Sequence, residues 1–172
     1  MPRLLVLACS ARKHRTPHPV PAWYRYDGVL FRLCKRLQAD RRFPPDVRIR
    51  ILSAEHGVLA PESPIPWYDR RLDDARAAEL RERVTRALCH AVDAEHASEV
   101  YLALGGRYRA AVGSLPPQVV VRGAPAGIGT MQSHLRSWLA TPPTAGGQLH
   151  LELSSARFGL AQDGPATHPP AR

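Results

Sequence analysis

The residues best suited to chemistry begin directly after the first apolar segment of the chain. Leu4 to Ala8 is followed at once by the run Cys9 to Lys13, and then by polar, basic and proline-rich sequence. Core packing cannot explain this change, because a thiol, hydroxyls and cations replace apolar side chains. Cys9 is a candidate nucleophile, and the cations of Arg12 and Lys13 would favour its reactive thiolate. The alternative is a small residue buried at the end of a strand.

The same part of the chain could also hold an anion. Ser10, Arg12 and Lys13 supply a hydroxyl and cations, although they lack P-loop spacing and a solvated turn explains them equally well. A second candidate is the glycine-rich run that contains Gly127 and Gly129, where N–H groups at a helix start could cradle phosphate. A tight turn that needs positive φ is the alternative for these glycines.

A third group of residues offers general acid and base chemistry. Glu55, His56, Tyr68 and Asp69 supply two carboxylates, an imidazole and a phenol, and Ser53 precedes them as a candidate ligand-binding residue. A carboxylate such as Asp69 would favour a charged His56, and burial would oppose it. Each of these side chains could instead be an ordinary hydrogen-bonded residue.

Four apolar segments must position these groups. Strands are predicted at residues 3–8, 47–52, 100–104 and 118–122, and helices at 27–37, 73–91, 107–113 and 128–138. The alternation predicts a single α/β domain with a mainly parallel sheet of four to five strands and helices on both faces. Each candidate segment follows a strand, so all should meet at the carboxyl rim of the sheet. Gly106, Arg107 and Tyr108 follow the third strand and join the candidate ligand-binding residues.

The expected domain ends with the last predicted helix. Ile128, Met131, Leu135 and Trp138 have helical spacing and are predicted to face the core. Residues 1–140 should therefore form the domain. Residues 141–172 form an extension rich in proline and glycine, with an edge strand expected at 149–153 and disorder elsewhere.

Composition restricts the class of protein. The net charge is +9, and residues 1–50 carry twelve lysines and arginines against three acids, which suits phosphate on a nucleotide or a nucleic acid. Trp23 and Tyr24 lie among these cations, as in base-stacking platforms, although aromatic residues more often pack a loop onto a core. High genomic GC content is another explanation of scattered arginines.

Three cysteines without C-x-x-C spacing predict no disulfide framework, and no apolar run is long enough to span a membrane. The short apolar N-terminus does not fit a secretory signal, so a cytoplasmic location is expected. His14 and His18 are four residues apart, but Pro17 and Pro19 prevent the helix that would align them, so we expect no metal and no other cofactor.

In combination, these motifs resemble bacterial and phage domains related to the YaaA peroxide-stress proteins. The shared pattern consists of the following segments in order: Cys9 to Lys13, Tyr26 to Gly28, Phe31-Arg32, Ile51 to Leu59, Tyr68-Asp69, Gly106 to Tyr108, Gly127 to Gly129, and Trp138-Leu139. A more distant resemblance is to the Cys-Ser-x-Lys domain of archaeosine synthase, which modifies a deazaguanine base in tRNA. That resemblance implies site roles for Cys9, Ser10, Lys13 and Tyr68-Asp69. The chain departs from these relatives in having Ala11, a shorter length than YaaA and no helix-hairpin-helix signature.

Two functions follow as hypotheses. The first is an enzyme with a pocket for a nucleobase, nucleoside or nucleotide, in which basic residues hold phosphate and the thiol, acids, imidazole and phenol do transferase- or glycosidase-like chemistry. The second is a non-catalytic protein of the peroxide-stress response that binds the backbone of DNA or RNA. A pocket requires the candidate residues to converge, whereas backbone binding requires only a basic surface.

Overall fold

The central strand of the protein is apolar on both of its faces. The computed structural model describes residues 1–143, and in it β1 (Arg3–Ala8) buries Leu4 and Val6 on one face and Leu5 and Leu7 on the other. All four side chains are fully buried. A strand buried on both faces is typical of a parallel sheet covered by two layers of helices.

Four further strands complete this sheet, in the order β4-β3-β1-β6-β7. β3 (Val47–Ser53), β6 (Glu99–Ala103) and β7 (Val120–Gly123) form a parallel array with β1, which confirms the predicted α/β fold. β4 (Gly57–Leu59) is antiparallel to β3, in a segment that the sequence pattern indicated only as a loop. Gly57 has a φ of 76°, so its freedom from a Cβ allows the tight reversal between these strands.

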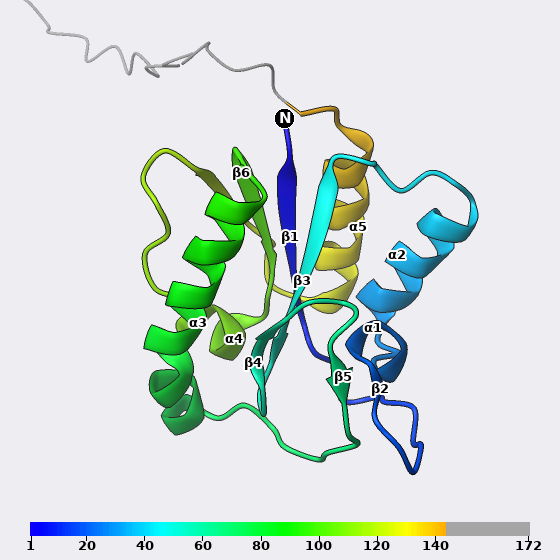
Figure 1. Ribbon diagram of the computed structural model, residues 1–172. Coiled ribbons are helices and arrows are strands. Elements are labelled where there is room, and N and C mark those ends of the chain that lie inside the picture. The colour runs from blue at the N-terminus through cyan, green and yellow to red at the C-terminus, as the bar shows by residue number, and fades with distance from the viewer. Residues whose placement is uncertain (144–172) are drawn as a thin grey trace, which may run out of the picture.

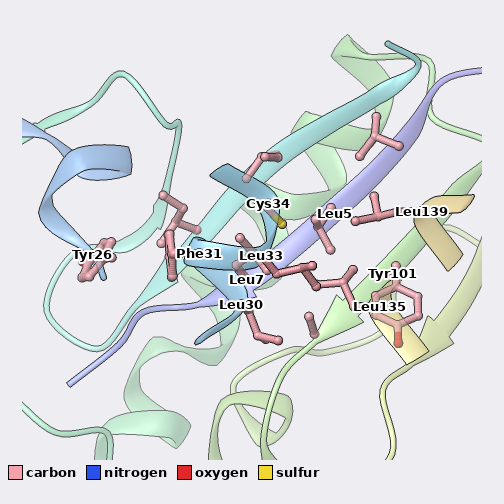
Figure 2. Packing of buried hydrophobic residues seen from close by; sticks show 14 of the residues in the cluster. Leu5, Leu7, Tyr26, Leu30, Phe31, Leu33, Cys34, Tyr101, Leu135 and Leu139 are labelled. Atoms are coloured by element: carbon pink, nitrogen blue, oxygen red, sulfur yellow. The ribbon is translucent and has the colours of Figure 1, made fainter. Parts of the chain in front are cut away.

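Helices cover both faces, as predicted (Figure 1). α2 (Val29–Ala39) and α5 (Ile128–Ala140) cover one face, and α3 (Asp74–Ala94) and α4 (Gly106–Ala110) cover the other. Figure 2 shows leucines of α2 and α5 packed beside those of β1 on the first face. α3 begins with an N-cap, because the Asp73 carboxylate accepts a hydrogen bond from the backbone N–H of Arg76 at 2.7 Å.

A small second sheet lies near the carboxyl ends of the parallel strands (Figure 1). It pairs β2 (Val20–Pro21) with β5 (Pro64–Ile65) in antiparallel fashion, and α1 (Ala22–Arg25) follows β2 directly. The sequence pattern gave no sign of these elements, because each is too short to show periodicity. They bring the proline-rich segment after β1 against the segment before Tyr68.

One side chain was wrongly predicted to face the core. Ile128 is 58% exposed, whereas Met131, Leu135 and Trp138 are buried as expected. Ile128 is the first residue of α5, and its side chain lines a cavity at the rim instead of packing between the helix and the sheet. The strand expected at 149–153 lies outside the described residues. Within residues 1–143, no helix has the length and apolar character needed to cross a membrane.

Candidate functional site

Cys9 lies at the carboxyl end of the central strand. Its backbone N–H donates to the carbonyl of Leu52 at 2.9 Å, which extends the pairing of β1 with β3 by one residue. The side chain is half-buried, and its Sγ lies 3.0 Å from the hydroxyl oxygen of Tyr108 in α4. The thiol is therefore held at the middle of the rim by backbone pairing on one side and a phenol on the other.

Two cavities meet at Cys9. An apolar cavity of about 360 Å³ lies between the N-terminal ends of α2 and α5, with Phe31, Ile128 and Met131 in its wall. A second cavity, of about 600 Å³, lies on the α4 side of the rim and is called the cationic cavity after its charged side chains. Its charged wall consists of four cations and one carboxylate, namely Lys13, Arg70, Arg71, Arg107 and Asp69. Cys9, Ser10 and Tyr108 line both cavities.

Behind Cys9, a chain of hydroxyl groups connects three distant parts of the sequence. The hydroxyl oxygen of Tyr68 lies 2.7 Å from that of Tyr26 and 2.8 Å from Oγ of Ser53. Ser53 Oγ also accepts the backbone N–H groups of residues 55 and 56, at 3.2 and 3.1 Å. A hydroxyl oxygen has two acceptor positions, so Ser53 donates its own proton to Tyr68.

Burial keeps these phenols in their neutral form. Burial, with a further contribution from the neighbouring Cys9, raises the pKa of Tyr26 to about 12. The same two causes raise the pKa of Tyr68 and of Tyr108 well above the ordinary value for tyrosine. All three tyrosines therefore retain their protons at neutral pH and are hydrogen-bond donors around the thiol.

Lys13 reaches the site because its loop folds back on the start of α2. Lys13 forms an antiparallel bridge with Tyr26, and the backbone N–H of Asp27 donates to the carbonyl of Arg12 at 3.1 Å. The ammonium group of Lys13 lies 4.6 Å from the centre of the Tyr68 ring, on its face. Arg12 forms a salt bridge with Asp27 at 3.1 Å and lines neither cavity.

A fully buried arginine fixes the loop between β1 and α1. The guanidinium of Arg25 donates to the backbone carbonyls of His14 and His18 and, at 3.1 Å, to that of Ile65. The loop and β5 are thus tied to α1 by one charged side chain. Since Lys13 belongs to the same loop, Arg25 is a positioning residue for the cationic cavity.

His56 and Glu55 occupy the turn between β3 and β4. The His56 ring packs edge-on against Tyr68, with 5.1 Å between the ring centres, and its buried Nε2 has no partner among the described residues. Burial lowers the pKa of His56; Glu55 opposes the shift and Arg83 adds to it. The charged neighbours that shift the pKa of His56 are thus Glu55 and Arg83, and not Asp69 as expected. Glu55 instead pairs with Arg70 at 3.2 Å.

Replacing His56 with glutamine is expected to reduce the loss of unfolding free energy that occurs as pH falls from 7 to 5. Because the folded protein has the lower pKa, the unfolded chain takes up the proton first as pH falls below about 6.5. Acidification from pH 7 to pH 5 therefore favours unfolding of the natural protein, and His56→Gln removes that contribution. Urea unfolding at a series of pH values measures it. His90→Gln, an exposed histidine on α3, is the control and should leave the profile unchanged.

The candidate residues divide into three groups in the structure. Those that line a cavity are Cys9, Ser10, Lys13, Asp69, Gly106, Arg107, Tyr108 and Gly127. Those in the turn and hydroxyl chain behind the thiol are Ser53, Glu55, His56 and Tyr68. Arg12 and Gly129 line neither cavity, and a Cβ on Gly129 would meet open space. Tyr68 contacts Lys13, Ser53 and His56 directly.

Several residues of the site were missed by reasoning from the sequence. Tyr26 belongs to the hydroxyl chain, and the motif Tyr26-Asp27-Gly28 was the available signal. Gly28 is needed because a Cβ there would lie 2.6 Å from Cβ of Ser10, too close for any side chain. Arg70 and Arg71 complete the cationic wall, but nothing in the local sequence distinguishes them from other surface arginines.

The part of the chain that carries this site also carries a family match. A comparison with models of protein families matches residues 4–137 to DUF6884, a family of unknown function. The matched residues include the central strand, both cavities and the hydroxyl chain. A comparison with curated proteins gives no match. Because this match covers most of the length of the chain, the chain belongs to the DUF6884 family.

Proposed function

We propose that this protein is a thiol-dependent enzyme that acts on a small ligand containing a nucleobase, such as a nucleoside or nucleotide. The observation that carries the proposal is that Cys9 lines an apolar cavity and a cationic cavity at once. A ligand with one apolar planar part and one anionic part could occupy both and present the bond between them to the sulfur. The resemblance to archaeosine synthase supports the same class of ligand.

The two cavities differ in the groups that they offer. Phe31, Met131 and Ile128 give the smaller cavity aromatic and aliphatic walls, suited to a planar base. Lys13, Arg70, Arg71 and Arg107 give the larger cavity four cations and Asp69 gives it one carboxylate; Arg70 also pairs with Glu55 and Arg107 with Asp74, which leaves Lys13 and Arg71 in excess. This excess of positive charge favours phosphate.

The chemistry available at the junction is nucleophilic substitution assisted by a phenol. The Cys9 sulfur forms a bond to an electrophilic carbon of the ligand, and the leaving group keeps the electron pair of the broken bond. The Tyr108 hydroxyl oxygen, 3.0 Å from the sulfur, accepts the proton of the thiol while the phenol passes its own proton to the leaving group, so Tyr108 ends the step neutral. Behind the thiol, the hydroxyl groups of Tyr26, Tyr68 and Ser53 hold one another in place by hydrogen bonds.

A screen of nucleobases, nucleosides and nucleotides by thermal unfolding tests the proposal. A ligand that binds only the folded protein adds ~2.7 kcal/mol of stability at a hundred times its Kd, a shift of about 5–10 °C for a chain of this size. The effective ligand should also slow alkylation of Cys9 by iodoacetamide, followed by mass spectrometry. Alkylation of Cys89 on α3, far from both cavities, serves as the internal control. Stabilisation without protection of Cys9 contradicts the proposal.

The alternative, a non-catalytic DNA-binding protein of the peroxide-stress response, is supported by the basic N-terminal third of the chain. It requires duplex DNA to bind at low salt with an affinity that falls steeply as salt rises, because each neutralised phosphate releases counterions. Two cations of the loop after β1 already have partners, since Arg12 pairs with Asp27 and Arg15 lies over Trp67, whereas Arg32, Arg36, Arg41 and Arg42 on and after α2 are exposed. We place the enzyme first because the residues around Cys9 converge on two cavities, which backbone binding does not require.

A further inference from the structure

A second groove lies away from Cys9, between the C-terminal end of α2, the start of β3 and the turn at Pro61. Its volume is about 790 Å³, the largest among the cavities described above. Three aromatic side chains line it: Trp23, Tyr24 and Phe43. None of the residues that line the two cavities at Cys9 belongs to this groove.

The aromatic wall combines a fixed ring with a free one. Trp23 is half-buried, with its ring centre 5.5 Å from that of Phe31 and the ammonium of Lys35 at 5.7 Å from its own centre. Tyr24, the next residue, is 65% exposed. An exposed tyrosine beside an anchored tryptophan offers flat apolar surface at little cost in side-chain entropy.

Cations accompany these rings. Arg41 and Arg48 line the groove together with one carboxylate, Glu62; both arginines are exposed, and Arg48 also pairs with Glu95 at 3.4 Å. Arg32 and Arg36 are also exposed on α2, the helix whose C-terminal end forms one side of the groove. The groove itself therefore has two arginines and one carboxylate in its wall, in the part of the chain where lysines and arginines most exceed acids.

We propose that this groove binds single-stranded nucleic acid, with a base stacked on the exposed ring of Tyr24, with Trp23 and Phe43 as the apolar wall behind it, and with phosphates near Arg41 and Arg48. Exposed rings favour a single strand over a duplex, because paired bases do not present their faces to a protein. The cations favour a polyanion over a proline-rich peptide, which aromatic rings alone would also suit. This proposal does not depend on the function proposed for Cys9.

Fluorescence anisotropy with labelled oligo-dT and oligo-U tests the groove. Tyr24→Ala is expected to weaken binding about tenfold or more, and Tyr24→Phe to retain most of it, since stacking uses the ring. Arg41→Asn removes a cation and should also weaken binding. Asparagine is the chosen replacement because Arg41 has a φ of 55°, a conformation that asparagine tolerates. The matched control is Arg86→Asn on α3, an exposed arginine far from the groove.

The outcomes separate specific stacking from general charge attraction. Loss of affinity in Tyr24→Ala and Arg41→Asn, with most of the affinity kept in Tyr24→Phe and all of it in Arg86→Asn, supports the groove. Unchanged affinity in Tyr24→Ala, or equal losses in Arg41→Asn and Arg86→Asn, overturns it. Tighter binding of a duplex of equal length, or displacement of the oligonucleotide by polyglutamate of equal charge, also overturns it.

Discussion

Replacing Cys9 with serine is expected to reduce turnover of the stabilising ligand by several orders of magnitude while leaving its binding intact. A serine hydroxyl fits the space of the thiol but is a far weaker nucleophile without an adjacent general base. The sulfur lies where the two cavities meet, and neither of the other thiols can replace it: Cys34 is buried on the inner side of α2, and Cys89 on α3 lines neither cavity. Steady-state kinetics with the ligand found by thermal unfolding measures the loss.

Two further measurements make this result specific. Cys89→Ser changes a half-buried thiol on α3 and should leave turnover at the natural rate. The ligand-induced thermal shift of Cys9→Ser should match that of the natural protein, which separates chemistry from binding. Turnover in Cys9→Ser within about tenfold of the natural rate would exclude the sulfur as nucleophile.

Replacing Arg25 with methionine is expected to lower the free energy of unfolding by ~2–3 kcal/mol, because one buried and two partly buried carbonyl groups lose their donor and a buried unsatisfied carbonyl costs ~1–3 kcal/mol. Those carbonyls belong to His14, His18 and Ile65, so the loop after β1 and strand β5 would separate from α1. Methionine keeps much of the length and apolar stem of the side chain. Urea unfolding followed by circular dichroism measures the change.

Controls on the same part of the chain distinguish lost hydrogen bonds from lost charge. Arg32→Met removes an exposed cation from α2 and should change stability by no more than ~0.5 kcal/mol. Arg25→Lys keeps the charge but loses the planar fork of donors, so its free energy of unfolding should lie between that of Arg25→Met and that of the natural protein. A loss below 1 kcal/mol in Arg25→Met would show that water replaces the guanidinium at these carbonyls.

The sheet and its helices were predictable because their signals are local. Residues 4–7 are a continuous apolar run, residues 47–51 alternate, and the helix after Asp73 shows both a cap and an apolar stripe. These periodicities follow from backbone geometry alone. The rule that parallel strands end at one edge of a sheet then placed Cys9 and Ser53 on the same rim.

Periodicity gave no information where elements are short or side chains lie on a boundary. β2, β5 and α1 have two to four residues each, and only their pairing with distant segments makes them regular. Ile128 has the spacing of a core residue, yet it lies on the first turn of α5, beyond the end of the sheet that would cover it.

The amino-acid sequence alone determined the α/β architecture, the excess of cations near the N-terminus and the position of the thiol after the first strand. Only the tertiary structure decided that Tyr26 and Tyr68, 42 residues apart, share a hydrogen bond beside Cys9, and that Arg25 is buried under a loop of polar residues. Such contacts depend on side chains from unrelated segments meeting in the interior. Burial makes each unpaired polar group costly, so the partners become essential only after the chain has brought them together.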